Sequence, residues 1–215
     1  SVTVTGMILS ASPIGENDKR IVILTKEKGK ISAFAKGARR QNSHLLGATN
    51  PFSFGEFVLY EGRSSYNLLQ ANISNYFMEL ATDLEGAYYG FYFMEFADYY
   101  TKEHNDERQM LRLLYQTLRA LSSNKIPREL VRYIFEIKAV VLNGEYPGLP
   151  KNKDYEESTR YALQYIADSS VEKLYSFKVS DEVLQELEEI AGIYQRRFVD
   201  RKMKSLEILE GLIYN

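Results

Sequence analysis

The sequence predicts an α+β protein in which a small five-stranded β-barrel, residues 1–78, is followed by an all-α helical domain, residues 79–215. In the first part, short runs of β-branched and aromatic residues are separated by Gly, Asn, Asp and Ser, a pattern typical of strands. In the second part, apolar residues recur every three or four positions, as in helices. With 215 residues, 45% of them hydrophobic, the chain can bury a core in each of two domains.

Five strands are predicted in the N-terminal part, at residues 2–9, 20–25, 31–36, 54–60 and 66–73. Gly29 belongs to a tight connection between the second and third strands, where the absence of a Cβ atom permits a positive φ angle. Five short strands in about 75 residues favour a closed barrel of the OB-fold type, because closure removes exposed sheet edges.

Amphipathic helices are predicted for the remainder of the chain, at residues 80–100, 107–122, 128–142 and 155–166. A further helix is expected to begin after Ser180, whose hydroxyl can cap it, and to run into a basic segment near Arg196. Pro127 suits the first turn of the helix at 128–142. Two prolines and a glycine between residues 147 and 150 cannot extend a helix, so we expect an irregular lobe at about 144–179.

The composition excludes several classes of protein. The chain has no cysteine, which excludes disulfides, thiolate catalysis and cysteine-ligated metals, and which fits the cytoplasm. We find no run of about 18 uncharged apolar residues and no signal-peptide pattern, so neither a membrane span nor export is expected. The net charge of −2 gives no overall reason to expect a polyanionic partner.

The sequence also lacks catalytic motifs. It contains no Walker A loop, no dinucleotide-binding glycine pattern and no Gly-x-Ser-x-Gly elbow. The two histidines, His44 and His104, belong to no metal-binding pattern. We therefore expect a binding protein that is not an enzyme and that holds neither a cofactor nor a metal.

Positive charge is concentrated in residues 19–40, which hold eight Lys or Arg against Glu27 alone. A barrel with this charge on adjacent strands is typical of a phosphate-backbone binder, although a solvated edge that prevents aggregation gives the same pattern. Residues 36–40 (Lys-Gly-Ala-Arg-Arg) favour phosphate binding. The glycine lets backbone N–H groups approach a phosphate, and guanidinium groups bind phosphate through two hydrogen bonds.

A second basic cluster, Arg196, Arg197, Arg201, Lys202 and Lys204, lies near the C-terminus. These bases either extend the binding surface or complement the dipole of a helix end. Ten aromatic residues lie between residues 76 and 100, and their helical spacing favours a buried core over base stacking, with a groove for a partner peptide as the alternative. In the barrel, Phe34, Tyr60 and Tyr66 are expected in the core rather than in contact with bases.

The motifs at residues 15–25 (GENDKRIVILT), 27–30 (EKGK) and 35–40 (AKGARR) resemble the RecO family of bacterial DNA repair proteins. Further matching elements are Ser43, Gly47, Pro51-Phe52, Leu142-Asn143-Gly144, Pro147 and Ser205-Leu206. The resemblance implies an N-terminal OB-fold, a helical domain and a cytoplasmic, nucleoid-associated recombination mediator. The implied partners are single- and double-stranded DNA, the C-terminal tail of single-strand-binding protein, RecR and, indirectly, RecA.

Carried onto this sequence, the resemblance makes the basic residues of the barrel candidate DNA contacts: Lys19, Arg20, Lys30, Lys36, Arg39 and Arg40. Arg196, Arg197, Arg201 and Lys202 are candidates for an extension of the same surface. We expect the protein to anneal complementary strands and to help exchange single-strand-binding protein for recombinase. Six phosphate contacts imply a log–log salt slope of roughly −4 to −5. The alternatives are an adaptor whose helical domain binds an acidic peptide, and an RNA-binding OB protein.

One departure from the family concerns the irregular lobe. Many members carry four zinc-binding cysteines after the positions that correspond to Gly144 and Pro147, whereas this sequence has none. We therefore expect packing to hold residues 147–179. The expected contributors are Tyr155, Tyr161, Leu163, Tyr165, Ile166, Leu174, Tyr175 and Phe177.

Overall fold

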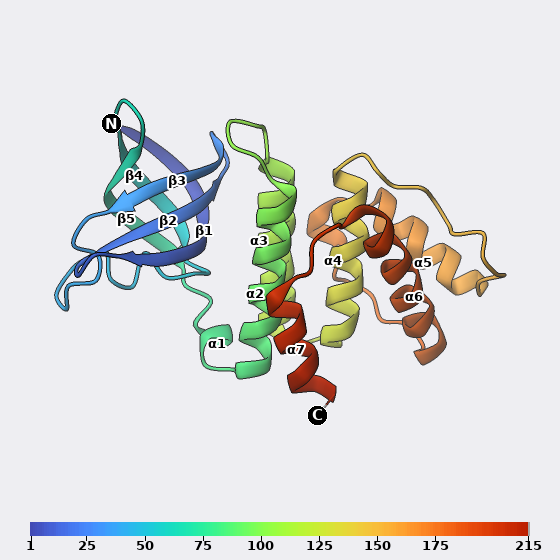
Figure 1. The fold of residues 1–215 in the computed structure, drawn as a ribbon. Helices are drawn as coiled ribbons and strands as arrows, with labels where there is room; N and C mark the ends of the chain where they lie inside the picture. Colours follow the sequence, from blue (N-terminus) through green and yellow to red (C-terminus); the bar gives the residue numbers. More distant parts are fainter. Residues whose placement is uncertain (215) are drawn as a thin grey trace. The chain divides into compact units, whose positions relative to one another are not determined.

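A computed structural model describes residues 1–214. Within that range the chain forms five β-strands, seven α-helices and one 3-10 helix (Figure 1). The chain divides into two compact units. The barrel unit comprises Ser1–Thr82 and Met94–Leu111, and the helical unit comprises Asp83–Phe93 together with the chain from Arg112 onward.

The strands close into a barrel in the order β1-β2-β3-β5-β4 (Figure 1). Their bounds are Val2–Ile14 for β1, Asp18–Thr25 for β2, Gly29–Ala35 for β3, Phe54–Glu61 for β4 and Tyr66–Asn75 for β5. The pairing of β3 with β5 is parallel, and the other neighbouring pairs are antiparallel. The predicted OB-fold barrel is confirmed.

The first strand continues past the predicted end at Leu9 because its ladder with β2 runs on to the pair Ile14 and Asp18. Four of its last five residues are exposed, and two of the five are serines, so the buried apolar run ends before the hydrogen-bonded ladder does. Inside the barrel, inward-facing residues such as Ile21, Ile23 and Phe57 are fully buried. Each such side chain contributes about 1.5–3 kcal/mol of hydrophobic free energy to folding.

The helices are α1 Met78–Ala81, α2 Leu84–Tyr100, α3 Arg108–Ser123, α4 Arg128–Leu142, α5 Glu157–Asp168, α6 Asp181–Phe198 and α7 Lys204–Tyr214, with the 3-10 helix η1 at Val171–Lys173. The prediction of one helix over 80–100 is wrong. The helix is interrupted because Asp83 Oδ1 accepts a hydrogen bond from the Gly86 N–H and so caps the start of α2. The basic segment after Arg196 is likewise interrupted at Val199, and α7 is a separate helix that was not predicted.

The aromatic residues of α2 are mainly core residues, as predicted. Tyr89, Tyr92, Phe93 and Phe96 are each exposed by no more than 1%. Within the helical unit, the ring of Phe93 packs 4.7 Å, centroid to centroid, from that of Phe135 on α4.

The cysteine-free lobe is held by apolar packing and by one buried lysine. Leu163 and Leu174 are buried, as predicted, whereas Tyr161 is 75% exposed, contrary to its predicted part in the packing. At the C-terminal end of α5, Lys138 Nζ donates hydrogen bonds to three carbonyl oxygens, those of Ile166 at 3.0 Å, Ala167 at 3.1 Å and Ser169 at 2.7 Å. This ammonium group satisfies carbonyls that a helix end leaves without partners.

The lobe does not fit the four-cysteine zinc site that the family resemblance implies, because the chain has no cysteine to supply a thiolate ligand. Across residues 1–214, no group of three or more His, Cys, Asp or Glu side chains is arranged to hold a metal ion. None of the helices in this range combines the length and the apolar character needed to cross a bilayer.

Candidate nucleic-acid interface

The basic loop at residues 36–40, here called the cationic loop, directly follows β3. Lys36, Arg39 and Arg40 are exposed, and none of them forms an ion pair with any residue of the described chain. Cations without acidic partners keep their full attraction for phosphate.

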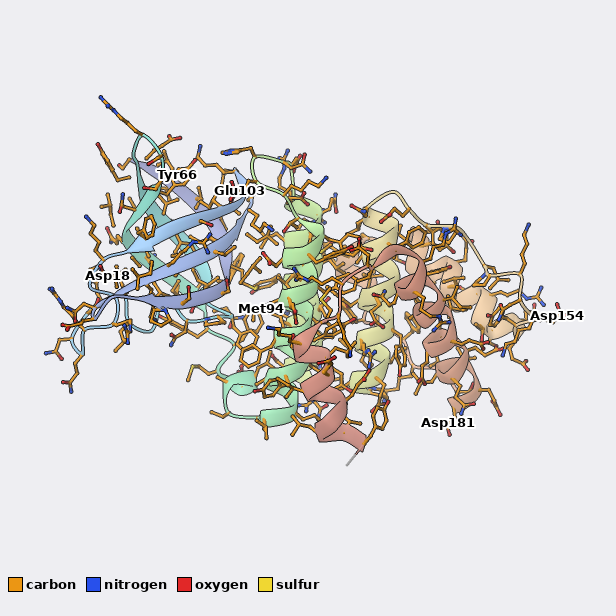
Figure 2. All side chains as sticks on the ribbon, viewed as in Figure 1. Asp18, Tyr66, Met94, Glu103, Asp154 and Asp181 are labelled. Carbon is orange, nitrogen blue, oxygen red and sulfur yellow. The ribbon has the colours of Figure 1, made fainter. Side chains whose placement is uncertain are left out.

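The β1–β2 turn holds the cationic loop in place. Gly37 has a φ angle of 70°, a conformation that favours glycine, and its N–H donates to Asp18 Oδ1 at 2.7 Å (Asp18 is labelled in Figure 2). The Arg39 N–H donates to the Asn17 carbonyl at 2.9 Å, and Arg39 Nη1 donates to the Gly15 carbonyl at 2.8 Å. The loop therefore presents its charges from a fixed backbone.

A depression of about 470 Å³ lies beside the cationic loop. Lys36, Gly37 and Arg40 line it together with residues 41–43, which add amide and hydroxyl groups. Two cations and several hydrogen-bond donors around one depression are suited to a phosphate group.

The burial of Lys19 argues against its predicted contact with DNA. It is 9% exposed, and its Nζ donates to the Leu46 carbonyl at 3.1 Å, to Thr49 Oγ1 at 2.8 Å and to Asn50 Oδ1 at 3.1 Å. Burial, followed by the nearby charge of Arg39, lowers the pKa of this lysine. Lys19 therefore links segment 45–50 to the barrel, and its ammonium group is largely shielded from solvent. The strand alternation explains its position, because its cross-strand partner Ala35 is also buried.

Lys30 and Arg20 differ in their access to a ligand. Lys30 Nζ forms an ion pair with Asp98 Oδ1 at 3.1 Å and donates to the Asp98 carbonyl at 2.8 Å, so its charge is offset. Arg20 is exposed, and its Nη2 donates to Ser32 Oγ at 2.8 Å. Arg20 forms no ion pair within residues 1–214. Of the six basic residues of the barrel that were predicted to contact DNA, four remain candidates: Arg20, Lys36, Arg39 and Arg40.

A groove of about 370 Å³ lies on the outer face of β3, here called the β3 groove. It is bounded by the β4–β5 connection at residues 62–65 and by residues 103–104. Its polar, charged and aromatic side chains include Arg20, Phe34, Glu61, Arg63, Tyr66, Glu103 and His104 (Tyr66 and Glu103 are labelled in Figure 2).

The barrel aromatics divide between core and surface. Tyr66 packs against the barrel core, as predicted, and its hydroxyl donates to Glu61 Oε1 at 3.3 Å. Phe34 and Tyr60 are 38% and 56% exposed, so their predicted place in the core is wrong. Both residues on either side of Phe34 are buried alanines, and alternation along β3 therefore turns Phe34 outward.

The C-terminal basic cluster, Arg196, Arg197, Arg201 and Lys202, lies in the helical unit, and all four bases are exposed. Three of them, Arg196, Arg201 and Lys202, line a cavity of about 570 Å³. Five carboxylates line the same cavity: Glu136, Glu188, Glu189, Glu207 and Glu210. Lys202 Nζ forms an ion pair with Glu207 Oε1 at 2.8 Å. Nearby acids thus offset part of this positive charge.

Two family models match the sequence. The first, "Recombination protein O N terminal", matches residues 1–77, and the second, "Recombination protein O C terminal", matches residues 81–152. A DNA repair protein RecO from Acetivibrio thermocellus is 29% identical, over 97% of this chain and 96% of its own length. One from Clostridium kluyveri is 29% identical over 96% and 92%, respectively. One from Alkaliphilus metalliredigens is 37% identical over 67% and 58%.

Proposed function

This chain belongs to the RecO family of DNA repair proteins, and we propose that it is a mediator that binds DNA through its barrel and anneals complementary strands. Family membership supports a role in DNA repair and recombination. The finer proposal includes help in exchanging single-strand-binding protein for RecA, in the bacterial cytoplasm at the nucleoid. The observation that carries it is the cationic loop, which presents three basic side chains that form no ion pair within the described residues.

The proposed mechanism is charge neutralisation. Two complementary strands repel each other through their phosphates, and bound cations lower that repulsion while releasing counterions. Arginine is well suited to this role because its planar guanidinium binds two phosphate oxygens at once. Arg20, Lys36, Arg39 and Arg40 supply up to four phosphate contacts. Four contacts imply a log–log salt slope of about −3.6 for duplex and about −2.8 for single strands.

The proposed protein partners follow from the family alone. They are the C-terminal tail of single-strand-binding protein, RecR and, through them, RecA. We assign none of these partners to named residues.

The first experiment replaces Lys36, Arg39 and Arg40 together by alanine. Losing three phosphate contacts should weaken duplex binding on the order of 100-fold at about 0.15 M salt and reduce the salt slope by about 2.7. Fluorescence anisotropy over a salt series measures both quantities. Lys151→Ala/Lys173→Ala/Lys178→Ala is the matched control, because it removes the same charge from three exposed lysines of the lobe. Its affinity should stay within about twofold of wild type.

A second experiment tests the annealing function directly. Wild-type protein should accelerate the annealing of complementary fluorescent oligonucleotides, both free and coated with single-strand-binding protein, and the loop variant should lose most of that acceleration. Binding that does not depend on salt would contradict the proposal. If wild-type protein binds an acidic peptide tail but has no affinity for DNA, the adaptor function is the correct one.

A further inference from the structure

We propose that the β3 groove binds one unpaired base of single-stranded DNA by stacking it on Phe34. This inference rests on the proposed function and adds a base-binding subsite to the phosphate-binding loop. It assigns single-stranded DNA to the groove. The cationic loop alone does not distinguish single strands from duplex, because both carry phosphates.

The first argument is the exposure of Phe34. Its neighbours Ala33 and Ala35 point into the barrel, so the phenyl ring stands on the outer face of the strand, and 38% of the residue is accessible. A solvent-facing aromatic ring on an OB-fold strand is the usual platform for a nucleobase, because every base has a flat π face. A base stacked on Phe34 would also remove the exposed apolar surface of the ring from water, which is favourable.

The second argument is the charge of the groove. Its two arginines, Arg20 and Arg63, are matched by two acids, Glu61 and Glu103. A wall with balanced charge does not attract a continuous run of phosphates, unlike the cationic loop. The groove therefore adds an aromatic ring, that of Phe34, to the phosphate contacts of the cationic loop. Arg20 is the cross-strand partner of Phe34 and can bind the phosphate of the nucleotide whose base stacks on that ring.

The third argument is that the wall of the groove is built onto the barrel. Gly29 on the β2–β3 hairpin forms an isolated bridge with Glu103, and the Lys30 N–H donates to the Lys102 carbonyl at 3.4 Å. A Cβ atom on Gly29 would lie 2.3 Å from the Asn105 carbonyl oxygen, so only glycine permits this approach. Residues 103–104 are thus held beside β3, and the groove exists without a ligand.

The fourth argument concerns size and continuity. A volume of about 370 Å³ lies at the small end of ligand sites, at about 300–1,000 Å³, and suits one nucleotide better than a base-paired helix. Phe34 precedes Lys36 by two residues, or about 7 Å along an extended strand. A single strand whose base stacks on Phe34 can therefore place its neighbouring phosphate in contact with the cationic loop.

The two subsites predict different salt responses. Contacts to phosphate weaken as salt rises, whereas stacking is nearly independent of salt. Single-stranded DNA uses both subsites, and duplex, whose bases stay stacked on one another, uses the cationic loop. Substitution of Phe34 should therefore change affinity for single strands without changing the salt slope.

The test uses Phe34→Ala and Phe34→Trp in the full chain. Phe34→Ala should weaken binding of a single-stranded oligonucleotide roughly 5- to 150-fold at an unchanged salt slope, and should leave duplex affinity within about twofold. The chain contains no tryptophan, so Phe34→Trp introduces a single tryptophan, whose emission can be excited selectively over that of the tyrosines and whose ring also provides the stacking surface. Its emission should be quenched by single strands and not by duplex.

The matched control is Tyr60, an aromatic of the same barrel that is 56% exposed and does not line the groove. Tyr60→Ala should leave single-strand affinity unchanged, and Tyr60→Trp should not be quenched. Thermal melting verifies that each variant folds. Equal losses for single strands and duplex in Phe34→Ala, or an unquenched Phe34→Trp that binds DNA, would overturn the inference while leaving the proposed function intact. Wild-type protein that binds no DNA would overturn the proposed function itself.

Discussion

The cationic loop and the C-terminal basic cluster look alike as sequences, yet they differ in how their charges are balanced. Residues 36–40 hold three bases, and residues 196–202 hold four. The three basic residues of the loop form no ion pair within the described chain, whereas three basic residues of the C-terminal cluster share their cavity with five glutamates. The comparison teaches that charge density along a sequence does not give the electrostatic potential of a surface.

The difference has a local cause in each region. Beside the cationic loop, the carboxylate of Asp18 accepts the Gly37 N–H and is engaged by the backbone. In the helical unit, Arg196 and Arg197 lie in the last turn of α6, where positive charge complements the helix dipole. The carboxylates of α6 and α7 face the same cavity as the C-terminal bases.

The largest expected effect is a loss of stability on replacing Arg132, a residue of the helical unit whose charge is paired with a buried acid. Arg132 Nε contacts Glu136 Oε2 at 3.3 Å, and the Tyr92 hydroxyl donates to the same carboxylate, which is 1% exposed. Arg132→Ala leaves this acid buried without its counter-ion, so the free energy of unfolding should fall by about 3–5 kcal/mol. Urea denaturation measures the loss, and Arg40→Ala should change stability by less than about 0.5 kcal/mol.

The Arg132→Ala loss should also depend on pH. Burial raises the pKa of Glu136, and the charge of Arg132 opposes that rise. Because the folded pKa is raised, the penalty for the ionised acid is present at neutral pH and is relieved as pH falls through the folded pKa. The deficit should therefore be largest at neutral pH and shrink as the pH is lowered. Adding Glu136→Gln should recover part of it, and a deficit that is constant with pH would contradict this account.

A smaller effect is expected from Lys19, the base in the barrel that acts structurally. Lys19→Met keeps the apolar stem but leaves the Leu46 carbonyl and two side-chain oxygens without their donor. Unfolding free energy should fall by about 1–3 kcal/mol. Hydrogen exchange should show faster opening of residues 45–50. If stability is unchanged while DNA affinity falls as far as in the loop variant, Lys19 is a DNA contact after all.

The smallest effect is expected from the C-terminal cluster. Arg196→Ala/Arg201→Ala/Lys202→Ala removes as much charge as the loop variant, but all three side chains line a cavity whose carboxylates already offset part of that charge. Duplex affinity should fall less than about threefold at about 0.15 M salt, because partly neutralised charges release few counterions. Anisotropy titration compares the two variants directly. A loss near 100-fold would make the C-terminal cluster part of the DNA-binding surface and remove the contrast with the loop.

Much of the fold could be predicted from local pattern. The strand alternation places Ile21 and Ile23 inside the barrel, and the bounds of α4 follow from Pro127 and its apolar spacing. The interruptions at Asp83 and Val199 could not be predicted, because apolar spacing continues across both. Helix ends depend on single capping bonds, such as the one from Gly86 to Asp83, and not on the average character of a segment.

The sequence by itself determined the barrel, the helical part and the local excess of positive charge, because these depend on periodicity and composition. Tertiary structure decided which charges and rings reach a ligand. Lys19 and Lys30 both lie within two residues of exposed positions. Lys19 is nevertheless buried against segment 45–50, and Lys30 forms an ion pair with Asp98, a residue distant in the sequence. Phe34 is solvent-facing for the same kind of reason: barrel closure fixes the side of a strand that faces the core, and distant residues fix what covers the other side.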